Sequence, residues 1–278
     1  MAPPKYADLG KAAKDCLSKD FVVGDVKFEV ATKTSTGVAF KTITTKNQKD
    51  GTVDGTCEAK YLYKPYNLEV TEKWSTAGVL LQTLSIEGLA DGLKIDNDTS
   101  YNTNNEAITS VVKVDYVQKQ IRTTADVNLL KKVVNATSVF NHNQVFVGVQ
   151  AAYDGANGAV ASKTIAASYI APDFQFTTST DGEKVSSSLH HRVSAQTVAA
   201  VAFGWKKGTN ETDFALGGHF NLDAGSFLKA KLTHTGQLTF GYTQVVSPNA
   251  KVSVGMNVDS KNLSTDAHRL GFSLVLSA

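Results

Sequence analysis

The fold class is decided by residues 269–276, RLGFSLVL, close to the end of the 278-residue chain. The residues at 270, 272, 274 and 276 are apolar, whereas Arg269, Gly271 and Ser273 occupy alternate positions. This period of two is typical of a β-strand with one apolar face. Such a face has to be covered, either by lipid or by a protein core.

The same alternation recurs along most of the chain, in residues 26–30, 68–71, 112–116, 145–149, 214–220, 238–242 and 252–258. Short turn signals separate these segments, among them Asp50-Gly51, Asp91-Gly92, Asp154-Gly155, Asp181-Gly182 and Pro248-Asn249. Short turns predict antiparallel pairing between neighbouring strands. We therefore predict an all-β chain with about 19 strands between residues 25 and 277, most of them about ten residues long.

Strand length and number favour lipid over a protein core. Strands of globular proteins average about five to six residues, whereas about 9 to 11 tilted residues cross a bilayer. A closed barrel of about 16 to 18 or more strands leaves an aqueous channel, which requires a polar inner face. The residues opposite the apolar stripes that would supply this face are Lys27, Glu29, Lys229, Lys231, Lys251, Asn257 and Arg269. The alternative is a soluble β-sandwich that carries these charges on its solvated surface.

Composition excludes several other classes. The longest apolar run, residues 198–205, is far shorter than the roughly 18 to 20 residues of a spanning helix. Lys and Arg total 28 against 26 Asp and Glu, a balance that indicates no nucleic-acid partner. Cys16 and Cys57 lack disulfide or metal spacing and are expected to be free thiols. With no nucleotide-binding motif, and with His190 and His191 pointing to opposite faces, we predict no enzyme, cofactor or metal site.

The N-terminal residues differ in pattern from the rest of the chain. They contain no apolar stretch typical of a secretory signal, and Asp8, Asp15 and Asp20 argue against an Arg-rich presequence. From residue 6 to residue 17, Leu9, Ala13 and Cys16 recur at helical spacing. We predict a short amphipathic helix here.

Several motifs together resemble the eukaryotic mitochondrial porins, or voltage-dependent anion channels, over the whole chain. They are residues 4–15 (PKYADLGKAAKD), Thr71-Glu72-Lys73-Trp74, Gly92-Leu93-Lys94, the signature-like region 220–244, and the C-terminal pattern of Arg269, Gly271, Leu274 and Leu276, which resembles the sorting signal of mitochondrial barrels. Phe220 and His234 depart from the usual signature residues. Residues 20–24 keep one glycine where vertebrate members have a hinge of several.

The resemblance implies a transmembrane barrel built as an antiparallel meander of 19 strands, which a parallel first and last pair closes. Residues 1–24 would form an N-terminal segment with its helix inside the pore, and residues 25–278 the barrel. The implied function is a voltage-gated, weakly anion-selective diffusion pore for ATP, ADP, phosphate and small ions in the mitochondrial outer membrane.

The resemblance also implies site residues. Lys11, Lys14 and Lys19, with Asp8 and Asp15, would act in the pore and in gating; the alternative is an ordinary solvated helix face. Glu72 is in phase with Leu68, Val70 and Trp74 and would face lipid as a carboxylate, unless the strand ends there and Glu72 reaches the headgroups. The implied nucleotide contacts are Lys11, Lys19, Gln237, Leu238, Thr239, Gly255, Met256, Asn257, Val258 and Asp259.

The implied partners are the lipid bilayer, permeating nucleotides and small anions, further copies of the chain, and cytosolic kinases and apoptosis-related proteins. Two alternatives to the channel stay open on the sequence. One is the barrel subunit of the mitochondrial protein-import translocase, which usually carries a longer N-terminal extension. The other is the soluble β-sandwich binding module.

Overall fold

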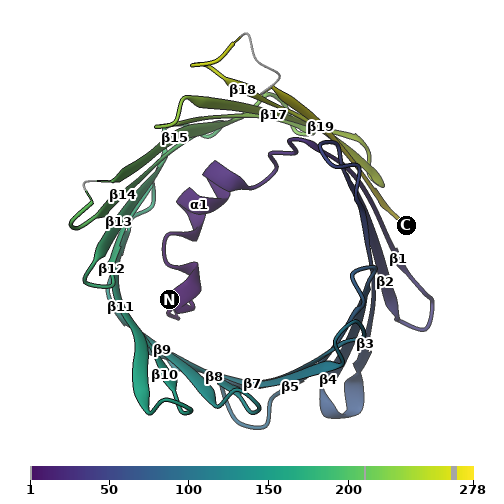
Figure 1. The fold of residues 1–278 in the computed structure, drawn as a ribbon, viewed down its shortest axis with the longest axis vertical. Helices are drawn as coiled ribbons and strands as arrows, with labels where there is room; N and C mark the ends of the chain where they lie inside the picture. Colours follow the sequence, from purple (N-terminus) through teal and green to yellow (C-terminus); the bar gives the residue numbers. More distant parts are fainter. Residues whose placement is uncertain (1, 210, 264–267) are drawn as a thin grey trace. The chain divides into compact units, whose positions relative to one another are not determined.

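The computed structural model describes residues 2–209, 211–263 and 268–278. These residues form 19 strands, one α-helix and two short 3-10 helices (Figure 1). The helices are η1 (Tyr6–Asp8), α1 (Lys11–Ser18) and η2 (Lys64–Tyr66). The strands are β1 (Asp25–Lys33), β2 (Ala39–Asn47), β3 (Val53–Tyr63), β4 (Leu68–Ser75), β5 (Val79–Glu87), β6 (Leu93–Asn102), β7 (Ala107–Val117), β8 (Ile121–Asn128), β9 (Val133–His142), β10 (Val145–Asp154), β11 (Ala159–Ile170), β12 (Phe174–Thr180), β13 (Lys184–Arg192), β14 (Thr197–Lys206), β15 (Thr212–Asn221), β16 (Ser226–Thr233), β17 (Gln237–Ser247), β18 (Ala250–Asp259) and β19 (Arg269–Ser277). None of the helices in the described residues is long and apolar enough to cross a membrane.

The strand order closes on itself, because β1 pairs with both β2 and β19 (Figure 1). Neighbouring strands pair antiparallel from β3 to β10 and from β12 to β19. An odd number of strands makes the first and last of the meander run in the same direction, so the sheet is mixed. The predicted 19-stranded barrel is confirmed. The sandwich alternative is wrong, because a sandwich needs two separate sheets.

The chain divides into two compact units. Unit 1 comprises Met1–Leu9, Ala31–Ile43 and Asp54–Ala167, and unit 2 comprises Gly10–Val30, Thr44–Val53 and Ser168–Ala278. The strands of both units are seven to twelve residues long, as predicted for strands that cross a bilayer.

In unit 2 the burial pattern is the reverse of that in a soluble protein. On β19, Leu270 is 61% and Phe272 41% exposed, whereas Gly271 and Ser273 are buried. On β17 and β18 the hydroxyl groups of Thr243 and Ser253 are also buried, with their oxygens 2.9 Å apart. In each unit, we call the side of the strands on which large apolar side chains are exposed the apolar face, and the other side the polar face. An apolar face of this extent would be unusual on a soluble monomer, so we expect lipid or another protein surface to cover it.

The N-terminal helix is shorter than predicted. The spacing predicts a single helix from residue 6 to residue 17, but the structure has η1, a break and then α1. The break arises because Leu9 is extended and Gly10 adopts a left-handed conformation with φ of 76°, which glycine tolerates without a steric penalty. Ala13, Cys16 and Leu17 form the buried stripe of α1, as their spacing predicts.

Candidate permeation pathway

Helix α1 packs on the polar face of unit 2, against β13, β14 and β15. Its buried stripe meets Ala200 on β14, where small side chains leave room for the helix. Gly217 on β15 also leaves room for the helix, because a Cβ there would lie 2.7 Å from Cδ2 of Leu17. The apolar stripe of an eight-residue helix is thereby covered, which a helix this short needs in order to be stable.

Residues 19–24, which we call the strap, follow α1 along a row of wall glycines. Gly241, Gly255 and Gly271 are aligned across β17, β18 and β19. A Cβ on Gly255 or Gly271 would overlap with the carbonyl oxygen of Val22. The end of the strap is fixed by its backbone: the Gly24 N–H donates to Leu270 O at 2.9 Å. The strap therefore lies flat on the polar face.

Lys229 on β16 is a buried cation below the end of α1. Its Nζ donates to the carbonyl oxygens of Asp15 at 3.3 Å and Lys19 at 3.0 Å, and pairs with Oδ2 of Asp20 at 3.3 Å. The other oxygen of Asp20, Oδ1, lies 3.6 Å from Nζ of Lys251. The sequence predicts that Lys229 lines the pore but does not predict this contact. The one sequence feature that points to this contact is that Lys229 occupies the polar phase of its strand.

A cavity of about 580 Å³ lies beside the strap in unit 2. Its lining includes both ends of an ion pair, Lys27 Nζ and Glu29 Oε2, which are 2.9 Å apart. Lys19 and Lys251 add positive charge, and Asp20 and Asp25 add negative charge. The cavity is therefore polar and of mixed charge.

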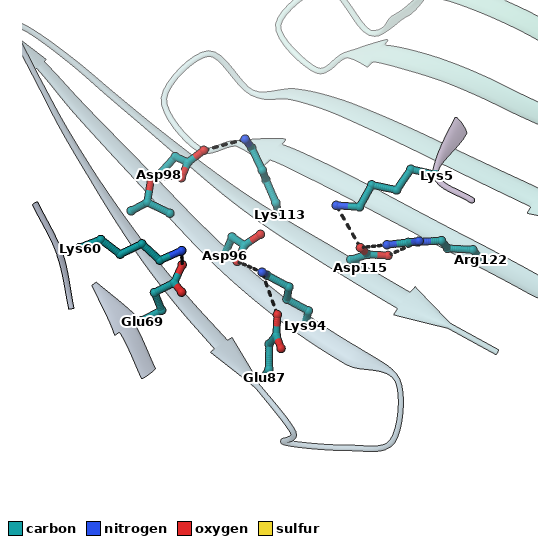
Figure 2. A network of polar contacts seen from close by, with 11 residues as sticks. Lys5, Lys60, Glu69, Glu87, Lys94, Asp96, Asp98, Lys113, Asp115 and Arg122 are labelled. Carbon is teal, nitrogen blue, oxygen red and sulfur yellow. Dashed lines mark hydrogen bonds and ion pairs between the residues drawn. The ribbon is translucent and has the colours of Figure 1, made fainter. Parts of the chain in front are cut away.

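The polar face of unit 1 carries a series of ion pairs (Figure 2). Asp115 accepts two hydrogen bonds from Arg122, Nε to Oδ1 at 2.9 Å and NH2 to Oδ2 at 2.6 Å, and Lys5 of the N-terminal segment lies 3.1 Å from Oδ2. The other pairs are Lys60 with Glu69 at 2.8 Å, Lys94 with Glu87 at 2.8 Å, and Lys113 with Asp98 at 2.6 Å. Because acids and bases neutralise each other here, this wall carries little net charge.

The Gly92-Leu93-Lys94 motif combines a turn with one of these pairs. Gly92 has φ of 75°, and a Cβ there would overlap with the carbonyl oxygen of Val117. The N–H of Val117 donates to Gly92 O at 2.9 Å, which brings the two backbones together. Leu93 opens β6, and Lys94 follows on the polar face with Glu87 and, at 3.7 Å, Asp96. The glycine is required by the close backbone approach.

The comparison with protein families agrees with this architecture. The model of the eukaryotic porin family matches residues 2–271. This chain belongs to the eukaryotic porin family. The porin is 34% identical over 280 residues to the "Non-selective voltage-gated ion channel VDAC2" of Xenopus laevis, with 99% of each chain covered. It is 33% identical over 282 residues to the "Voltage-dependent anion-selective channel" of Drosophila melanogaster, with 100% of each chain covered.

Solved structures share the fold of this porin at low identity. A mutant of the Rh. blastica porin gives a TM-score of 0.51 at 8% sequence identity, covering 80% of this chain and 89% of that chain. At this identity the likeness concerns the fold alone.

The predicted pore residues of the porin lie on the N-terminal segment. Lys11, Lys14 and Lys19 are exposed; on α1, Lys11 lies opposite the buried stripe and Lys14 lies on its flank. Asp8 and Asp15 are half-buried. The segment thus presents cations to the open side of the polar face and packs its apolar side on the wall.

The predicted nucleotide-contact segments lie side by side on β17 and β18, because Gln237 pairs with Asp259 and Thr239 with Asn257. These four residues and Gly255 share the phase of the polar face. Strand alternation puts Leu238, Met256 and Val258 on the apolar face instead. Nucleotide contact therefore stays a prediction for the first group, whereas the side chains of the second group point away from the polar face.

Glu72 lies inside β4 and not at its end, on the same face as Val70 and the 68% exposed Trp74. Across the strand pair, Gln82 Nε2 of β5 donates to Glu72 Oε1 at 3.3 Å. The apolar face thus carries one hydrogen-bonded carboxylate and amide pair. The alternation in the sequence predicts this phase for Glu72, but it does not predict Gln82 as the partner, because that partner depends on the strand register.

Of the predicted sorting-signal residues, Gly271 lies beneath the strap, and Arg269 opens β19 beside Gly24. Leu274 and Leu276 continue the apolar phase of that strand. A sorting role for the four stays a prediction. Both cysteines are free, as expected, with Cys16 buried and Cys57 exposed.

Proposed function

We propose that this porin is a voltage-gated, weakly anion-selective diffusion pore that passes ATP, ADP, phosphate and small ions across the mitochondrial outer membrane. The observation that carries the proposal is the reversed burial of the strands: Leu270 and Phe272 are exposed, whereas Ser273 and Lys229 are buried. Lipid would cover the apolar face, and water the polar face. The names of the Xenopus and Drosophila relatives, which align over nearly their whole length, both support a voltage-gated ion pore. The name of the Drosophila relative also supports the anion preference.

In this proposal residues 1–24 lie in the lumen and residues 25–278 form the transmembrane barrel. The exposed lysines of α1 face the water that fills the pore. Fixed positive charge near a low-dielectric wall raises the local concentration of anions. The preference for anions is weak because the acids of unit 1 share the polar face with their paired bases.

Voltage closure requires charge that moves through the membrane field. Each elementary charge that crosses the full potential contributes about 2.3 kcal/mol per 100 mV. A partial displacement of the N-terminal segment, which carries Lys11, Lys14 and Lys19, would suffice. Further copies of this chain, cytosolic kinases and apoptosis-related proteins are its proposed protein partners.

Release of ATP from proteoliposomes tests the proposed solute class. Vesicles loaded with ATP and a large dextran should lose the ATP and retain the dextran once the refolded porin is inserted. Protein-free vesicles, and vesicles mixed with the urea-unfolded chain, should retain both. Retention of ATP by vesicles that contain the inserted, folded protein would overturn the proposal.

A further inference from the structure

The cation that contacts the end of α1 lies on the wall, 210 residues away from the helix in sequence. The side chain of Lys229 is 6% exposed, and its three acceptors, Asp15 O, Lys19 O and a carboxylate oxygen of Asp20, all belong to one short segment. A buried charge is stable only when it is paired and hydrogen-bonded. Lys229 therefore keeps these three acceptors only while that segment lies against the wall.

The contact also stabilises the C-terminal end of α1. The last carbonyl groups of a helix have no partner within the helix, and its C-terminal end carries partial negative charge. In α1 the Lys19 N–H donates to Asp15 O, and Lys229 Nζ adds a charged donor to the same oxygen. Asp20, the next residue, has φ of 65°, a conformation that non-glycine residues seldom adopt without support from their surroundings.

The neighbouring wall lysines make different contacts. Lys231, two residues further along β16, lies over the ring of Phe21 with Nζ 5.1 Å from the ring centroid. Lys251 lies 3.6 Å from Oδ1 of Asp20 and over the ring of Phe227, with Nζ 5.6 Å from the ring centroid. The hydrogen bonds to the backbone at the helix end come from Lys229.

We propose that Lys229 is a positioning residue that latches the end of α1 and the strap to the wall, and so fixes Lys14 and Lys19 in the pathway. Its effect on conduction rests on the proposed channel function, whereas the latch itself is a statement about the position of the segment. Without the ammonium group, two backbone carbonyls lose their charged donor and Asp20 keeps Lys251 alone. The segment should then leave the wall far more often.

The chain contains a reporter for this event. Cys16 is 5% exposed, follows Asp15 directly and packs in the cluster around Ala200, so its thiol reacts only when α1 lifts. Burial raises the pKa of the Cys16 thiol, and the charge of Lys229 partly opposes this effect. Loss of Lys229 would therefore raise the pKa further and slow the reaction of a thiol that stayed in place. A faster reaction can only report exposure.

The test uses the full-length protein with Cys57→Ser, which leaves a single thiol. The reaction of Cys16 with N-ethylmaleimide, an uncharged reagent, is followed by mass spectrometry in detergent micelles and in liposomes. We expect Lys229→Met to accelerate the reaction about tenfold or more, because local opening then costs less. Lys229→Arg, which keeps the charge and the donors, should stay within roughly threefold of the parent rate.

Lys113→Met is the matched control. It removes a lysine that is paired with a polar-face carboxylate, Asp98, and that contacts no residue of the N-terminal segment among the described interactions. Its Cys16 rate should equal the parent rate. If Lys229→Met does not fold, as judged by circular dichroism, Lys229→Gln carries the same expectation, because its amide is too short to reach all three acceptors.

A parent-like Cys16 rate in a folded Lys229→Met or Lys229→Gln variant would overturn the latch. Acceleration by Lys113→Met to the same extent would also overturn it. The readout does not depend on conductance: acceleration without any ATP release by the parent protein would support the latch and reject the channel. ATP release by the parent protein together with unchanged Cys16 rates in the variants would support the channel and reject the latch.

Discussion

The carbonyl oxygen of Val22 occupies the space that a Cβ on Gly255 would need. Two flanking glycines, Gly241 and Gly271, are aligned with Gly255 on the neighbouring strands and lie against the same stretch of the strap. The strap can lie this close to the sheet because the three glycines below it have no side chains. A methyl group added to any of these glycines must therefore push the strap backbone away from the sheet.

Gly255→Ala should therefore displace the strap, and we expect a loss of about 1 to 3 kcal/mol in the free energy of unfolding, as for other overpacked sites. Limited proteolysis should show faster cleavage within residues 2–24, and urea unfolding in liposomes should show the lower stability. Gly218→Ala is the control, because its Cβ would lie 3.4 Å from its nearest neighbour, Val198 O. Equal sensitivity of the two variants to protease would contradict the seating of the strap.

The exposed lysines of α1 should contribute to ion selectivity. Reversal of one charge, Lys14→Glu, should lower the anion-to-cation permeability ratio by roughly a factor of two, because the local potential becomes less positive. The reversal potential in asymmetric KCl measures this ratio. Lys49→Glu makes the same charge change in the turn between β2 and β3 and should alter the ratio much less. A larger effect of Lys49→Glu would place the selective charge outside α1.

The carboxylate on the apolar face should destabilise the folded protein in a bilayer. Replacement by an uncharged side chain of similar shape, Glu72→Gln, removes a charge that lipid solvates poorly and keeps a hydrogen-bonding partner for Gln82. We expect an increase of about 1 kcal/mol in the free energy of unfolding from liposomes. Glu69→Gln breaks the polar-face pair with Lys60 and should give no increase. A lower stability of Glu72→Gln than of the parent would show that the ionised carboxylate is well solvated.

Acid should weaken the turn between β12 and β13. The backbone N–H groups of Lys184 and Glu183 donate to Oδ1 of Asp181 at 2.7 and 2.9 Å and hold the pKa of that carboxyl below its ordinary value. A carboxyl whose pKa is lower in the folded state adds stability above its unfolded pKa, and the contribution disappears as pH falls through the folded pKa. Asp181→Ala should thus be less stable than the parent at neutral pH, and the difference should shrink on acidification. A pH-independent difference, measured by urea unfolding, would exclude the ionised form as its source.

Much of the fold follows from local patterns, whereas the contacts of the N-terminal segment do not. Alternation places Leu270 and Phe272 on one face, and the Asp-Gly turns separate the strands, so strand number and face can be predicted. The break in the helical pattern lies at Gly10, but a glycine is an ambiguous signal, because isolated glycines also occur within helices. The contact between Lys229 and the end of α1, like that between Glu72 and Gln82, depends on which positions the strand pairing brings together, and a single sequence does not specify that register.

Single-channel recording in a planar bilayer tests the central claim most directly. The purified porin in asymmetric KCl should give stepwise conductance, a reversal potential that shows weak anion preference, and closure at high voltage of either sign. A folded, membrane-inserted protein that gives no conductance steps, or that passes cations in strong preference to anions, would contradict the account.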